Sequence, residues 1–140
     1  MQELTTFINS HPLLSAGTLA VFICLTIIEL LRARRNVFSI NPARVTQLIN
    51  RENATVIDIR QQDVYKKNHI IDAQSMTAET ILKDPKKLDK LRARPVIIVG
   101  TTGNDSQKIA ALLLKHGYNA YSLSGGMRAW TDAQMPLVGE

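Results

Sequence analysis

The stretch from Gly100 to Ser106 has the composition of a loop that could hold an anion or present a reactive group. Its residues, in order, are Gly100, Thr101, Thr102, Gly103, Asn104, Asp105 and Ser106. A loop between a strand and a helix directs backbone N–H groups at whatever lies in front of the helix. It contains no cysteine, and its two threonines have no base beside them that would activate a hydroxyl. The stretch is therefore a candidate anion or ligand loop without an evident nucleophile.

Asp58 and Arg60 form a second pair of interest because they follow an apolar strand, where ligand crevices open in α/β sheets. The simpler interpretation is an ion pair that ties the strand to the following loop. The alternative is that Arg60 faces the candidate loop as an anion contact. His69 is predicted to pack and hydrogen-bond rather than to act as a base.

Metal and thiol chemistry have little basis in this sequence. No pair of histidines or carboxylates has the spacing of a metal site, and the single cysteine, Cys24, cannot supply one. Cys24 lies within an apolar run, where a thiol is expected to be inert. We expect no metal and no cofactor.

Two strong local patterns flank the loop region. Val96 to Val99 is a run of β-formers typical of a strand buried on both faces, and Ile109, Leu112, Leu113 and His116 follow at helical spacing. Gly117 can end that helix in the left-handed conformation. Asp105 is expected to cap its beginning, accepting hydrogen bonds from the amides that follow.

The remaining elements alternate between strand and helix. Strands are predicted at 55–59, near Ala73 and at 120–123, and helices at 42–50, 61–67, 77–91 with a break at Asp84-Pro85, and 127–133. Asn41 should cap the first of these helices, with Pro42 at its first position. This order predicts an α/β fold with a mostly parallel sheet and helices on both faces.

The first 31 residues contain no Lys or Arg, and residues 13–31 are almost entirely apolar or small. Such a run, about 28 Å long as a helix, is typical of a transmembrane span. A cleaved signal peptide is the main alternative, although it would begin with basic residues and be shorter. We expect a short extracytoplasmic N-terminus (1–11), a transmembrane helix (12–31), a basic linker (32–39) and a globular domain (40–140).

Arg32, Arg34 and Arg35 follow the apolar run, and basic residues beside a span favour the cytoplasmic side. The sequence therefore predicts a single-pass membrane protein with its N-terminus outside and its domain in the cytoplasm. Ala16 and Ala20 form a small-xxx-small pair, a pattern that favours self-association or docking to other membrane proteins. The overall charge of +5 owes much to the arginine cluster, and no basic–aromatic pattern suited to nucleic acid is present.

Several stretches together closely resemble a rhodanese domain. They are Asp58-Ile59-Arg60, Tyr65 with His69-Ile70 and Ala73, the region 96–116, and Gly125-Gly126-Met127-Arg128-Ala129-Trp130. With its single N-terminal span, the chain resembles the YibN-type membrane-anchored rhodanese-like proteins of Gram-negative bacteria. The resemblance implies the rhodanese-like fold, a parallel sheet flanked by helices, and a location in the inner (cytoplasmic) membrane. It also implies a domain that is known elsewhere for moving sulfane sulfur through a cysteine persulfide.

The chain departs from the family's pattern at the nucleophile. The family's loop, Cys-x-x-Gly-x-x-Ser, puts Gly100 in place of the cysteine, and Thr101 and Asp105 replace cationic residues of active members. Asn68 and Asp72 stand where the family usually has glycine. The resemblance therefore implies a catalytically silent module that binds a protein or senses an anion. The alternatives are a sulfurtransferase that uses a cysteine from a partner or second chain, and a protein that acts through its transmembrane helix.

Overall fold

The computed structural model describes residues 10–36 and 38–140, and only the backbone of 32–36. The chain divides into two compact units, Met1–Asn36 and Val37–Glu140. In the first unit, the N-terminal segment expected at 1–11 lies mostly outside the described residues. The basic side chains after the apolar run also lie outside them.

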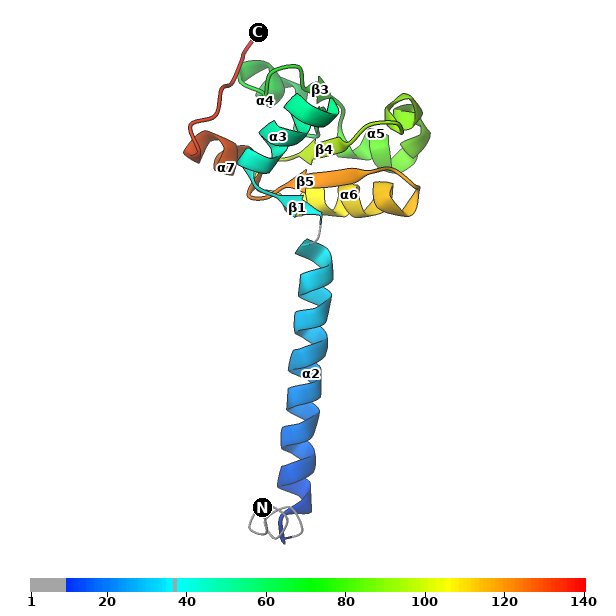
Figure 1. Cartoon of the computed structure of the whole chain (residues 1–140), viewed down its shortest axis with the longest axis vertical. Helices are drawn as coiled ribbons and strands as arrows, with labels where there is room; N and C mark the ends of the chain where they lie inside the picture. The colour runs from blue at the N-terminus through cyan, green and yellow to red at the C-terminus, as the bar shows by residue number, and fades with distance from the viewer. Residues whose placement is uncertain (1–9, 37) are drawn as a thin grey trace. The chain divides into compact units, whose positions relative to one another are not determined.

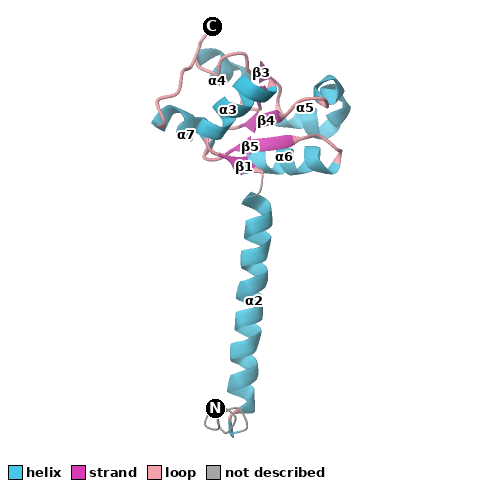
Figure 2. Ribbon diagram, viewed as in Figure 1, coloured by secondary structure: helices cyan, strands magenta, loops and turns pink. Residues whose placement is uncertain are grey.

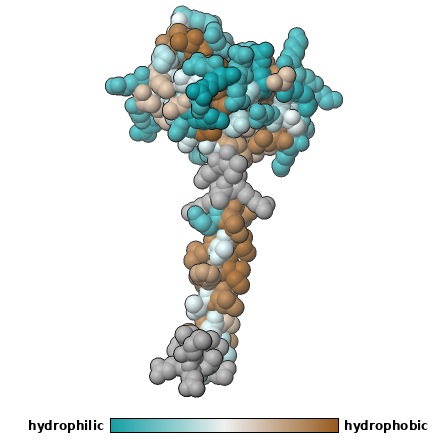
Figure 3. All heavy atoms as spheres, in the orientation of Figure 1, coloured by the Kyte–Doolittle hydropathy of each residue, from teal (hydrophilic) through white to brown (hydrophobic). Residues whose placement is uncertain are grey.

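Helix α2 (Pro12–Asn36) forms the described part of the first unit (Figure 1). Its segment Pro12–Leu31 has 20 residues and a mean hydropathy of 2.2, so it is long and apolar enough to cross a membrane. None of this segment is buried within the protein. Figure 3 shows hydrophobic side chains along this helix. The expected span matches this segment, but the backbone stays helical to Asn36, through much of the stretch predicted as a linker.

The second unit contains a five-stranded sheet in which every pairing of strands is parallel (Figure 2). The strands lie in the order β1-β5-β4-β2-β3. They are β1 (Ser39–Ile40), β2 (Thr55–Asp58), β3 (Gln74–Ser75), β4 (Val96–Val99) and β5 (Ala120–Leu123). The predicted parallel sheet is confirmed. The edge strand β1 was not predicted, and it pairs with Ser122 and Leu123 of β5.

Helices cover both faces of this sheet, as predicted. They are α3 (Pro42–Glu52), α4 (Gln62–Lys67), α5 (Ala78–Lys83), the 3₁₀ helix η1 (Pro85–Leu91), α6 (Asn104–Lys115) and α7 (Gly126–Asp132). Asn41 caps α3 by accepting from the Arg44 amide, and Gly117 has a φ of 84° at the end of α6. Both features agree with the expectation.

An apolar core lies on each face of the sheet. One joins α3, α4 and α7 through Leu48, Tyr65 and Trp130 to alternate residues of the strands. The other joins α5, η1 and α6 to the opposite set, which includes Ile57 and Ile98. Strand β4 contributes to both cores, and all four of its residues are fully buried, as expected for the central strand of a parallel sheet.

Candidate functional site

The candidate loop begins at Gly100, directly after β4, and is shorter than the sequence predicted. Gly103 takes a φ of 100° and forms the N-cap of α6, so the helix begins at Asn104. The prediction that Asp105 caps this helix is wrong. Asp105 lies inside the first turn with its side chain 80% exposed, 3.8 Å from Lys108 Nζ. The positive φ of Gly103 turns the chain two residues earlier than a side-chain cap at Asp105 would.

Hydrogen bonds within and beside the loop hold its backbone in place. The Met127 amide donates to Gly100 O at 2.9 Å. The buried Ser106 hydroxyl donates to Gly103 O at 2.8 Å. The Gln107 amide also donates to Gly103 O, which leaves the amides of the preceding first turn at the open end of the helix.

The turn at Gly125-Gly126 packs directly against the loop. A Cβ on Gly126 would lie 2.5 Å from Gly100 O and 2.6 Å from Thr101 O. A Cβ on Gly103 would lie 3.2 Å from the Gly125 nitrogen. Gly126 therefore has no room for a larger residue, while at Gly103 the contact would be tight and the φ of 100° would strain any other residue.

Gly100 itself, in contrast, has room for a side chain. A Cβ there would meet only Ile59 at 3.7 Å and Ser106 Cβ at 3.9 Å, which are ordinary contacts, and its φ lies outside the left-handed region. The neighbouring Thr101 and Thr102 are exposed, and neither hydroxyl forms a hydrogen bond with any residue that the structure describes. The loop thus offers backbone amides and two exposed hydroxyls, and space where a side chain could project from position 100.

Asp58 and Arg60 form a buried ion pair, which confirms the simpler interpretation. Arg60 Nη2 lies 2.6 Å from Asp58 Oδ2, and the side chains are only 6% and 1% exposed. Arg60 Nε donates to Asp58 as well. Its Nη2 also donates to Asn68 O at 2.6 Å, and its Nη1 to Asn68 Oδ1 at 3.4 Å. All three guanidinium nitrogens have partners within the protein, so the structure favours the ion pair over the alternative of an anion contact.

His69 and Tyr65 have packing roles, as predicted for His69. Their rings stack with centroids 4.0 Å apart, and His69 Nδ1 lies 2.9 Å from Tyr65 O. Tyr65 donates its hydroxyl to Ala73 O at 2.6 Å, and burial raises the pKa of this phenol. The backbone of His69 pairs with Val138, which attaches the C-terminal segment to the end of α4.

Cys24 lies on α2, away from these residues in sequence. In the part of the chain that the structure describes, no group of three or more His, Cys, Asp or Glu side chains could hold a metal ion. The loop and the glycine turn are therefore in contact, and the described side chains of the domain include no thiol.

Comparison with known proteins places these features in context. The Rhodanese-like domain family model matches residues 41–133. The uncharacterized protein YibN of Escherichia coli (strain K12) is 31% identical over 140 residues, which cover 99% of this chain and 98% of that one. The thiosulfate sulfurtransferase GlpE of Pseudomonas fluorescens is 38% identical over 90 residues, 64% of this chain and 81% of that enzyme.

Solved structures share the architecture of the domain. The rhodanese-related protein from Thermoplasma volcanium superposes with a TM-score of 0.66 at 24% identity, over 73% of this chain and 98% of that one. A protein from Lactobacillus plantarum superposes with a TM-score of 0.64 at 28% identity, over 80% and 96%.

Proposed function

Because this chain belongs to the rhodanese-like domain family, we propose that it is a catalytically silent, membrane-anchored member that recognises a protein partner or senses an anion. One observation supports the proposal above all others. The chain has a single cysteine, Cys24, which lies in the apolar helix, so residues 37–140 contain no thiol. Sulfur transfer through a persulfide requires a thiolate that attacks the donor and carries the sulfur.

The position of Gly100 supports the same conclusion. The family's loop pattern puts the nucleophile at this residue, which directly follows the central strand β4. Glycine offers no attacking atom. The exposed hydroxyls of Thr101 and Thr102 do not hydrogen-bond to any base among the described residues, so they are not activated.

A protein partner suits the loop better than a multiply charged anion. The open amides at the start of α6 favour negative charge. However, Asp105 places its own exposed carboxylate in that first turn, and this like charge disfavours thiosulfate and similar donors. The exposed Thr101, Thr102 and Asn104 are suited to hydrogen bonds with a partner's surface.

We also propose that the protein is anchored in the inner membrane with its domain in the cytoplasm. The apolar segment Pro12–Leu31 is long enough to cross a bilayer, and the arginine cluster follows it immediately. A reporter fused after Glu140 should behave as cytoplasmic, and the full chain should resist alkaline extraction from membranes. A shortened, soluble periplasmic form would instead identify the apolar run as a cleaved signal.

The decisive test is thiosulfate-to-cyanide sulfur transfer by two full-length proteins, wild type and Gly100→Cys. We expect the wild type to remain at background. Because the Cβ of residue 100 meets only Ile59 and Ser106 at ordinary distances, the variant should fold. Sulfur transfer by the variant alone would show that the loop keeps a shape able to bind the donor and lacks only the nucleophile.

Activity of the wild type well above background would overturn the silent assignment. It would favour the alternative, a sulfurtransferase that uses a cysteine from a partner or a second chain. A Cys24→Ser variant is the matched control, since it removes the only thiol of the chain. Wild-type activity that survives Cys24→Ser in the purified protein would exclude Cys24 as its source.

A further inference from the structure

A cleft of about 330 Å³ lies at the amino end of the sheet, away from the loop at Gly100. Its walls include Asn53 at the end of α3, Thr55 at the start of β2, and Arg94, which precedes β4. Strands β2 and β4 are parallel, and Gly100 follows the other end of β4. Because the two sites lie at opposite ends of the same strands, the cleft is separate from the candidate loop.

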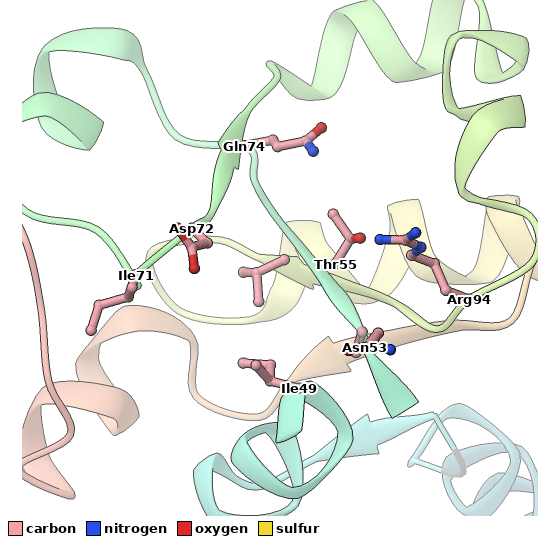
Figure 4. Close-up of a pocket in the computed structure, with 9 residues that line it drawn as sticks. Ile49, Asn53, Thr55, Ile71, Asp72, Gln74 and Arg94 are labelled. Atoms are coloured by element: carbon pink, nitrogen blue, oxygen red, sulfur yellow. The ribbon is translucent and has the colours of Figure 1, made fainter. Parts of the chain in front are cut away.

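One side of the cleft presents hydrogen-bond donors that make no side-chain hydrogen bond to the described residues. Figure 4 shows the Arg94 guanidinium directed toward Thr55, with Gln74 above the same space. None of these three side chains forms a hydrogen bond or ion pair with another residue in the described ranges. Thr55 is nevertheless only 8% exposed. A planar guanidinium beside a hydroxyl and an amide is well suited to a carboxylate.

The other side of the cleft is apolar and carries a negative charge. Ile49 and Val56 line it together with Ile71, which is 46% exposed. Asp72 lies beside Ile71 in Figure 4, across the cleft from Arg94. No described cation lies within ion-pair distance of Asp72. The backbone of this residue adopts a φ of 60°, a conformation that usually favours glycine.

We propose that this cleft binds a small zwitterion, a free amino acid or a short peptide, by its two charged ends. The carboxylate would lie against Arg94, Thr55 and Gln74, and the ammonium group would lie against Asp72. The aliphatic part of the ligand would cover the apolar side between them. The opposite charges of Arg94 and Asp72 favour a ligand with no net charge over an inorganic anion, which would leave Asp72 without a partner. The volume lies at the lower end of the range for small-molecule sites.

The test is isothermal titration calorimetry of the full chain in detergent micelles with three probes. They are L-alanyl-L-leucine, its N-acetylated form and its C-terminal amide. We expect the free dipeptide to bind best, because only this form presents both charges. Loss of a hydrogen-bonded charge should weaken binding about tenfold for each blocked form.

Two variants test which residue contacts the carboxylate of the ligand and which contacts its ammonium group. Arg94→Gln should weaken binding of the free and N-acetylated dipeptides about tenfold. Asp72→Asn should weaken the free dipeptide while leaving the N-acetylated form unchanged, and asparagine tolerates the positive φ at this position. Arg128→Gln, an exposed change on α7, is the matched control and should bind as the wild type does.

Several results would overturn the proposal. Absence of binding up to about 10 mM dipeptide would overturn it, because a site that contacts both charged ends of the ligand should saturate well below that concentration. Equal binding by the wild type, Arg94→Gln and Asp72→Asn would also do so, with circular dichroism showing that all are folded. The outcome is independent of the silent assignment, since Gly100→Cys should bind the dipeptides unchanged.

Discussion

Removal of Arg60 should lower the free energy of unfolding, because it leaves the buried charge of Asp58 without its partner. In Arg60→Met the aliphatic stem is largely kept, but Asp58, only 1% exposed, loses every side-chain donor shown for it. It keeps the backbone amide of residue 60, at 3.0 Å. Breaking a buried pair in this way typically costs about 3–5 kcal/mol. We take about 3 kcal/mol, because the amide remains.

This loss is large for a domain of this size, whose total stability is expected to be about 5–15 kcal/mol. Urea unfolding of the fragment 37–140 can measure it, since the members of both cores lie at Phe38 or later in the chain. With an m value of about 1.5 kcal/mol per molar urea, the midpoint should fall by about 2 M. Lys108→Met is the matched control. Its partner Asp105 lies 3.8 Å away with both side chains exposed, so no measurable change is expected.

A double-mutant cycle with Asp58→Asn separates the ion pair from the packing of the two side chains. Because an asparagine side chain at this position carries no charge, the double variant should cost at least about 1.5 kcal/mol less than the sum of the two single changes. A loss below about 1 kcal/mol for Arg60→Met would refute the reasoning, and so would strict additivity of the two changes.

Three further predictions concern other parts of the chain. Tyr118→Phe should lower the free energy of unfolding by about 1 kcal/mol at neutral pH, because the Tyr118 hydroxyl donates a hydrogen bond to Asp89 at 2.6 Å. Burial, and then this hydrogen bond, raise the pKa of Tyr118, so its contribution is present below about pH 10 and lost as the pH rises through the raised pKa. The variant should therefore lose less stability than the wild type in alkaline urea titrations, and equal losses would contradict this. Gly126→Ala should cost about 2 kcal/mol or more, since its Cβ would lie 2.5 Å from a loop carbonyl at a positive φ, and an unchanged urea midpoint would refute this. Replacing Ala16 and Ala20 by leucine should weaken crosslinking of the full chain in vesicles, and unchanged crosslinks would remove the small-residue face as a contact.

The parts of the fold that could be predicted are those with a strong local signal. The β-formers of β4 predict a buried strand, and the structure has it at Val96–Val99. Asn41-Pro42 predicts the start of α3 because the cap and the proline act within one turn. Strand β1 could not be predicted, since its two residues are a strand only through pairing with β5.

The candidate site was harder to predict because its geometry depends on contacts distant in sequence. Capping preferences favour Asp105 over a glycine, yet the turn at Gly125-Gly126 approaches so closely that Gly103 takes the cap position. The engagement of Arg60 with Asn68 likewise requires the end of α4 to lie beside β2. The cleft around Arg94 gathers residues from three separate segments, and no spacing along the chain indicates it.

The close packing of Gly126 against the loop has an evolutionary consequence. A glycine turn more than twenty residues downstream packs against the loop backbone, whereas position 100 has room for a side chain without any movement of that turn. Selection can therefore act on the two separately. A substitution at position 100 can change the chemistry that the loop offers and leave its backbone path intact, because no residue that maintains the path has changed.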